Sequence, residues 1–140
     1  MSRYVVDASV AVKWYLPEPE SDAAGRLLDP EHDLIAPDLL FAEVGNALWK
    51  RWRRGEIGLG DLRDPLAALA AVPFEVRSAA PLLSAAAEVA VTCGCTVYDG
   101  LYLALAFETG APLITADRRL AQRIAGGPWA RTVRTLAELE

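Results

Sequence analysis

Four acidic residues in this 140-residue chain stand where a buried strand ends or a helix begins. Asp7 closes the apolar run at residues 4–6, and Asp117 follows the apolar run at residues 112–115. Glu43 and Asp99 fall in the first turns of two expected helices. A single acid at such a place is an ordinary helix cap, or a side chain favoured by the positive end of the helix dipole. Four acids from four separate segments call for a common explanation.

Clustered carboxylates need a positive charge among them. Two carboxylates roughly 5 Å apart repel by about 3 kcal/mol at an effective dielectric constant near 20. A hard divalent cation removes that repulsion, and a set of oxygen ligands without His or Cys suits Mg²⁺ or Mn²⁺. Such an ion orients and activates water and screens the charge that develops on a phosphodiester under attack. The chemistry that these residues indicate is therefore phosphoester hydrolysis.

The expected elements bring the four acids to one edge of a sheet. Strands that alternate with helices predict an α/β fold, a three-layer α/β/α sandwich with a central, mostly parallel sheet. Functional groups in such sheets gather at the carboxyl ends of the strands. Expected strands are 4–6, 34–36, 74–76, 112–115 and 132–134; expected helices are 8–14, 21–29, 39–54, 66–72, 81–91, 97–108 and 118–125.

Local signals set several of these boundaries. Ser21 and Asp38 are the expected N-caps of the second and third helices. Thr96 and Asp99 have the spacing of a capping box. The two glycines of residues 58–64 predict a turn before the helix at 66–72.

Composition limits the class of protein. The chain is long enough for a single domain, residues 1–140, with its own core, and 53% hydrophobic residues exclude disorder. No uncharged apolar stretch approaches the length of a membrane span, and the N-terminus has no signal-peptide pattern, so we expect no membrane contact and a cytoplasmic location.

Charge and rare residues exclude further classes. A net charge of -5 argues against a general basic surface that coats nucleic acid. The single His32, expected in a polar turn, gives little support to a Ser-His-Asp triad or a histidine metal site. Cys93 and Cys95 are interpreted as small buried residues because they are too close together for an easy disulfide.

The blocks that carry the acids resemble the motifs of PIN-domain nucleases, most of all those of the small VapC-type toxins of type II toxin-antitoxin pairs. The resemblance covers nearly the whole chain in the expected order. Its most diagnostic part is Tyr-Asp-x-x-Tyr-Leu-Ala-Leu-Ala at residues 98–106. The matching blocks are residues 5–9, 41–48, 96–106 and 113–117.

This resemblance implies a metal-dependent endoribonuclease with a PIN-like fold that uses Mg²⁺ or Mn²⁺ and cleaves RNA. A cognate antitoxin would silence it, and the family usually forms homodimers. Asp7, Glu43 and Asp99 match the acidic triad, and Asp117 matches the more variable fourth acid. The residues that match supporting positions near the metal, its water or the phosphate are Ser9, Thr115 and Asn46.

Basic residues near these blocks are candidates for binding the RNA backbone, although a solvated helix face explains each one separately. They are Lys50, Arg51, Arg53, Arg54, Arg118 and Arg119.

Three alternatives stay open at this point. The chain could be a PIN-type RNA-processing nuclease outside a toxin-antitoxin pair. It could be a phosphatase that uses Asp7 as a phosphoaspartate nucleophile, although such sites typically have a second Asp two residues later, where this chain has Ser9. It could also be a non-catalytic binding module in which the acids only cap helices.

Overall fold

The centre of the fold is a five-stranded parallel sheet. The computed structural model describes residues 2–139, with strand order β3-β2-β1-β4-β5 and every pairing parallel. The strands are β1 Ser2–Val6, β2 His32–Pro37, β3 Glu75–Arg77, β4 Leu113–Thr115 and β5 Val133–Thr135. The predicted sheet is confirmed, and each strand lies within two residues of its expected place.

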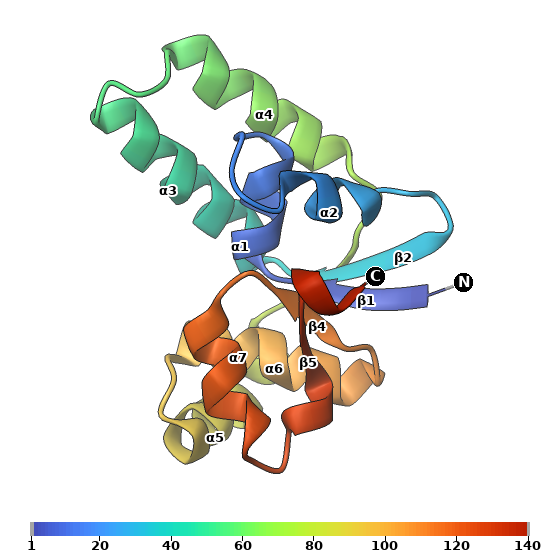
Figure 1. Cartoon of the computed structure of the whole chain (residues 1–140). Coiled ribbons are helices and arrows are strands. Elements are labelled where there is room, and N and C mark those ends of the chain that lie inside the picture. Colours follow the sequence, from blue (N-terminus) through green and yellow to red (C-terminus); the bar gives the residue numbers. More distant parts are fainter. Residues whose placement is uncertain (1, 140) are drawn as a thin grey trace.

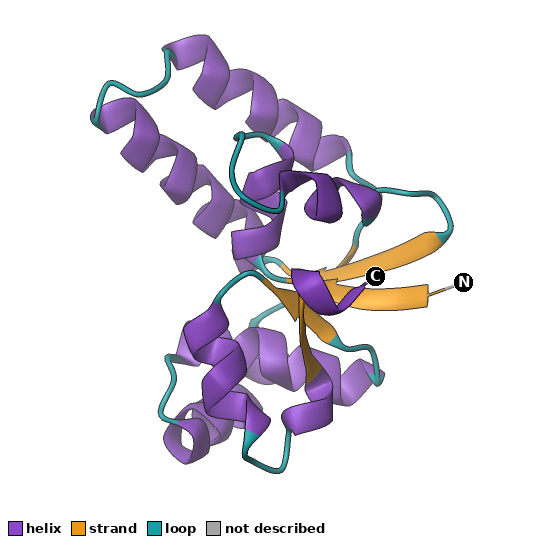
Figure 2. Ribbon diagram, in the orientation of Figure 1, coloured by secondary structure: helices purple, strands orange, loops and turns teal. Residues whose placement is uncertain are grey.

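Helices cover both faces of this sheet, as a three-layer α/β/α sandwich requires (Figures 1 and 2). Figure 1 shows α1 to α4 on one side and α5 to α7 on the other, and the α3 and α4 pair extends beyond the sheet. The first group is α1 Ala8–Ala11, η1 Val12–Trp14, α2 Ser21–Arg26, α3 Leu39–Arg53 and α4 Leu59–Ala71. The second is η2 Ala80–Leu82, α5 Leu83–Cys93, α6 Val97–Thr109, α7 Arg118–Ala125 and η3 Ala130–Thr132. The last turn, η4 Leu136–Leu139, lies on the side of the first group and contacts α2 (Figure 1).

The strand order places a topological switch point between β1 and β4. From β1 the chain proceeds to β2 and β3 on one side, and it returns to β4 and β5 on the other. Ligands in open parallel sheets bind beyond the carboxyl ends of the strands at such a point. Asp7 directly follows β1, and Asp117 lies two residues after β4.

Helix α6 is the buried element that supports this edge. Its residues from Gly100 to Ala106 are all buried, and it packs on β1, β2 and β4. Gly100 allows α5 to approach closely, because a Cβ atom there would lie 2.2 Å from the carbonyl oxygen of Ala86. The residue beside Asp99 therefore sets how near the two helices pack.

The expected turn at residues 58–64 is wrong, because α4 already begins at Leu59. The carboxylate of Asp61 accepts the N–H of Gly58 at 3.0 Å, which satisfies one of the free amides at the start of the helix. Pro65 lies inside the helix and removes one intrahelical donor. The carbonyl that loses its partner belongs to the exposed Asp61, where water can replace the bond.

Of the three expected caps, Ser21 is wrong, and Asp38 holds the N-cap position without a side-chain bond to its helix. The residue before α2 is Glu20, in a left-handed conformation with φ of 70°, and Ser21 is the first helical residue. Asp38 precedes α3, but its carboxylate accepts the N–H of Ala79 at 3.2 Å instead of an amide of α3. The Thr96 cap is confirmed, since its hydroxyl accepts the N–H of Asp99 at 3.1 Å.

His32, Cys93 and Cys95 also differ from their predicted environments. His32 begins β2 instead of standing in a turn, and its ring meets the ring of Tyr4 edge-on with centroids 5.3 Å apart. Cys93 and Cys95 are both free thiols of intermediate burial, so neither is fully buried. Within residues 2–139 no single helix has the length and hydropathy needed to cross a membrane.

Candidate active site

Asp7 is a buried carboxylate held by two hydroxyl groups. It occupies the N-cap position of α1, but its side chain accepts no amide of that helix. Its Oδ2 instead accepts hydrogen bonds from Ser9 Oγ and Thr115 Oγ1, both at 2.7 Å. The side chain is only 8% exposed. The capping alternative therefore does not describe the geometry of this acid.

The two hydroxyls are themselves fixed by backbone amides. Ser9 Oγ accepts the N–H of Ala116 at 3.0 Å, and Thr115 Oγ1 accepts the N–H of Asp117 at 3.0 Å. A hydroxyl has one proton to donate, so an oxygen that accepts from an amide can direct its proton at the carboxylate. This network joins the end of β1 to the end of β4 and orients Asp7.

Glu43 lies in the early part of α3 and is half-buried. Its Oε1 accepts the hydroxyl proton of Tyr102 at 2.7 Å. Burial raises the pKa of Glu43, the Tyr102 hydrogen bond lowers it in part, and the charges of Asp7 and Asp99 raise it further. The carboxylate thus lies within electrostatic reach of two other predicted site residues.

Asp99 and Asp117 complete the set of acids. Burial raises the pKa of Asp99, and the charge of Asp117 adds to that effect. Asp117 is exposed, and its Oδ1 accepts the N–H of Leu120 at 3.1 Å, so this acid does cap α7.

The pKa of Asp7 shows the same mutual influence. Burial raises it most, the Ser9 and Thr115 hydrogen bonds lower it, and the charges of Asp99 and Asp117 raise it again. Negative charges that resist ionising together are the electrostatic signature of a site suited to a cation. The structure therefore places each of the four acids within electrostatic reach of at least two of the others.

Tyr102 is the site residue that sequence reasoning missed. Its ring is buried, and the sequence pattern alone predicts only a core aromatic residue of α6. The available signal was its spacing, because a residue three positions after Asp99 shares a face of the helix with it.

The basic candidates divide into two groups. Glu43, Asn46, Lys50, Arg51 and Arg54 line an open pocket of about 340 Å³ along α3. Arg118 and Arg119 lie instead in the first turn of α7 and are exposed.

Two arginines of α3 already have other contacts. Arg51 forms ion pairs with Glu18 and Glu56. The guanidinium of Arg53 lies 5.4 Å from the centre of the Trp49 ring. Lys50 and Arg54 have no ion pair within residues 2–139, so they are the better placed cations of this pocket.

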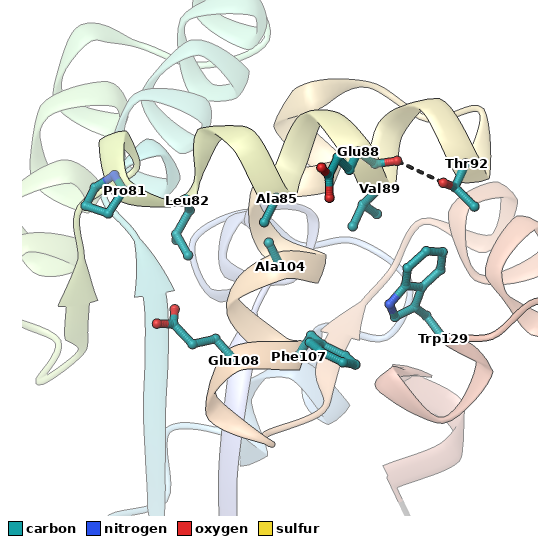
Figure 3. A pocket seen from close by; sticks show the side chains of 10 residues that line it. All are labelled: Pro81, Leu82, Ala85, Glu88, Val89, Thr92, Ala104, Phe107, Glu108 and Trp129. Carbon is teal, nitrogen blue, oxygen red and sulfur yellow. Dashed lines mark hydrogen bonds between the residues drawn. The ribbon is translucent and has the colours of Figure 1, made fainter.

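Another pocket lies away from the four acids. It has about 670 Å³ between α5, α6 and Trp129, and Figure 3 shows its mixture of apolar side chains with Glu88 and Glu108. None of the four site acids lines it.

The donor set fits a hard divalent ion. Asp7, Glu43, Asp99 and Asp117 supply only carboxylate oxygens, and Asp7 and Glu43 each have one oxygen fixed by hydroxyl donors. As the side chains stand, no three acidic, His or Cys residues within 2–139 lie in a group that could hold a metal ion without further ligands. Mg²⁺ and Mn²⁺ tolerate such open sites because they keep several of their own waters.

Comparison with known proteins identifies the family of this chain. The profile of the PIN domain matches residues 4–126. Ribonuclease VapC3 of Pyrobaculum aerophilum is 38% identical over 123 residues, which is 86% of this chain and 94% of that protein. Ribonuclease VapC1 of Mycobacterium tuberculosis is 37% identical over 123 residues, which is 86% of this chain and 90% of that protein.

Solved structures have the same fold. The crystal structure of PAE2754 from Pyrobaculum aerophilum has a TM-score of 0.74 and 28% identity, over 99% of this chain and 86% of that one. VapBC2 from Rickettsia felis, bound to a DNA fragment from its promoter, has a TM-score of 0.64 and 14% identity. The match covers 95% of this chain and 98% of that one. This chain belongs to the PIN-domain family, where its relatives include VapC ribonucleases.

Proposed function

We propose that this protein is a metal-dependent endoribonuclease and the toxin of a toxin-antitoxin pair. The observation that carries the proposal is the buried Asp7 carboxylate, held by two hydroxyls within electrostatic reach of Asp99 and Asp117. The relatives named ribonucleases, at 38% and 37% identity over most of their lengths, support the choice of RNA as substrate.

Each side chain has a distinct part in this mechanism. Asp7 would be the central ligand of the ion, and Glu43, Asp99 and Asp117 would be the others. Mg²⁺ or Mn²⁺, when bound there, supplies an acidified water and screens charge on the phosphodiester. Ser9 and Thr115 keep Asp7 in one orientation.

The open pocket along α3 is the proposed path of the RNA backbone. Asn46 faces it as a hydrogen-bonding side chain, and Lys50 and Arg54 offer positive charge to neighbouring phosphates. Because the chain as a whole carries a charge of -5, binding depends on these local cations. Arg51, Arg53, Arg118 and Arg119 remain secondary candidates for the same contact.

A cognate antitoxin and a second copy of this chain are the proposed protein partners, and the cytoplasm is the proposed location. Toxin-antitoxin complexes from Klebsiella pneumoniae and Rickettsia felis have the same fold, although at 14% identity they speak for the fold alone. For the homodimer, Val91 and Phe107 on the α5 and α6 surface are 86% and 70% exposed. Large exposed apolar groups commonly mark an interface.

Cleavage of a circular single-stranded RNA tests the enzymatic proposal. A circle has no ends, so only an endonuclease converts it into linear product. We expect wild type to do so with Mg²⁺ or Mn²⁺ and not with EDTA, and Asp7→Asn and Asp99→Asn to be inactive while folded. Asp33→Asn, at an exposed acid of β2, is the matched control. Equal cleavage by all four proteins would remove the site assignment.

Two further experiments separate the alternatives. A phosphoaspartate phosphatase needs Asp7 as an accessible nucleophile, whereas this carboxylate is 8% exposed with one oxygen occupied twice. We expect no hydrolysis of p-nitrophenyl phosphate. For the toxin role, co-expression of a short neighbouring reading frame should relieve growth arrest, and failure of any neighbour to do so would favour an RNA-processing nuclease.

A further inference from the structure

Tyr102 is a buried tyrosine whose hydroxyl reaches an acid from a distant part of the chain. Its side chain is 1% exposed, and its hydroxyl lies 2.7 Å from Glu43 Oε1, across 59 residues of sequence. Helix α6, which carries Tyr102, packs on β1 and β2, and α3, which carries Glu43, begins just after β2. The hydrogen bond therefore ties the two helices together at the edge of the sheet where the acids meet.

The phenol is the donor of this hydrogen bond. Its side chain is buried, and a hydroxyl has a single proton to donate. The proton of Tyr102 is therefore committed to Glu43 Oε1.

Satisfying a buried hydroxyl does not by itself require a carboxylate. Backbone carbonyls are the commonest acceptors for buried side-chain donors. Here the acceptor is a half-buried acid with several rotatable bonds, and the donor fixes one of its two oxygens. Holding Oε1 in this way leaves Oε2 as the Glu43 oxygen that Tyr102 does not occupy.

We propose that Tyr102 is a positioning residue that orients Glu43 for a divalent ion. This inference rests on the proposed metal-dependent function and deepens it. The hydroxyl of the buried Tyr102 holds Oε1 of Glu43 from the core side. Partners that orient a ligand in this way typically change metal affinity by about 10- to 100-fold when they are removed.

Calorimetric titration of the full chain with Mn²⁺, without RNA, tests this role. Tyr102→Phe keeps the ring and removes only the hydroxyl. We expect this variant to bind Mn²⁺ more weakly, with a dissociation constant about tenfold higher or more. Tyr98→Phe is the matched control, because Tyr98 lies in the same helix and is 60% exposed. Its dissociation constant should stay within about twofold of wild type.

A double-mutant cycle separates positioning from general damage. In a Glu43→Gln background, Tyr102→Phe should change Mn²⁺ affinity by less than about twofold, because its effect acts through the carboxylate. In RNA cleavage at limiting Mn²⁺, Tyr102→Phe should lower kcat. At high Mn²⁺ the kcat of the variant should return to the wild-type value, and its KM for RNA should be unchanged throughout. Tyr102→Phe removes one hydrogen bond and keeps the buried ring, so the variant should still fold.

The outcomes are distinct. Wild-type affinity in Tyr102→Phe, or an equal loss of affinity in both backgrounds, would overturn this inference alone. If wild type itself bound no Mn²⁺, the proposed metal dependence would fail and the inference with it.

Discussion

Replacing Asp7 with Asn should stabilise the metal-free protein even though it abolishes cleavage. Both hydroxyls donate to the same oxygen, Oδ2, so an amide oxygen in that place can accept both bonds. A hydrogen bond to a neutral acceptor contributes about 1 kcal/mol, and one to a carboxylate contributes about 2 kcal/mol. Replacing the carboxylate by an amide weakens two such bonds and therefore costs about 2 kcal/mol in all.

The substitution also removes the repulsion with Asp99 and Asp117. Two charges roughly 6 Å apart repel by about 3 kcal/mol at an effective dielectric constant of 20. Because Asp99 is only half-buried and Asp117 is exposed, water screens the two repulsions to about 3 kcal/mol in all. The net expectation is a gain of about 1 kcal/mol in the free energy of unfolding.

Urea unfolding near neutral pH measures this difference. In EDTA, Asp7→Asn should unfold at a higher urea concentration than wild type, and Asp33→Asn should match wild type. With saturating Mn²⁺ the order should reverse, because only wild type gains stability from the bound ion. A loss of more than about 1 kcal/mol in EDTA would mean that Asp7 is a structural acid, and the reasoning would be refuted.

Three other predictions concern pH, packing and RNA binding. The acids with raised pKa contribute stability that is fully present below their ordinary values, 3.8 for Asp and 4.5 for Glu, and lost as the pH rises through their raised values. Thermal melts in EDTA should therefore show falling stability from mild acid towards neutrality, and added Mn²⁺ should remove the fall. Gly100→Ala should lower the free energy of unfolding by about 1–3 kcal/mol, because its Cβ would meet the Ala86 carbonyl; urea unfolding checks this against Gly60→Ala, which has open space. Arg54→Gln should weaken RNA binding in a fluorescence anisotropy titration with kcat unchanged, whereas Arg51→Gln should mainly lower stability through its lost ion pairs.

The strands and the acids that follow them could be predicted because the signal is local. Val5 and Val6 are fully buried, as a strand covered on both faces requires, and the carboxyl end of such a strand has a known relation to the site. The same argument placed Asp117 after β4. Chain order and strand geometry were sufficient here, since no long-range contact had to be guessed.

The start of α4 could not be predicted because local and tertiary effects disagree. Gly58, Gly60 and Pro65 all favour a turn when they are considered alone. The packing of α4 against α3, with Leu69 buried between them and the core, outweighs those preferences. Helix stability in proteins comes largely from such packing.

Side-chain partners across the fold were also beyond local patterns. Asp38 bonds to an amide 41 residues away, and Tyr102 bonds to Glu43 across 59 residues. The sequence shows the donors and acceptors but not which of them the sheet brings together. For the same reason, it could not show that Asp117 caps α7 while Asp7 caps nothing.

The central claim is that acids from four segments hold one divalent site at the switch point of the sheet. Anomalous diffraction from a crystal soaked in Mn²⁺ measures this directly. The account predicts an anomalous peak bounded by the carboxylates of Asp7, Glu43 and Asp99, which is lost in Asp7→Asn crystals. A peak elsewhere on the molecule, or a peak that persists without the Asp7 carboxylate, would contradict it.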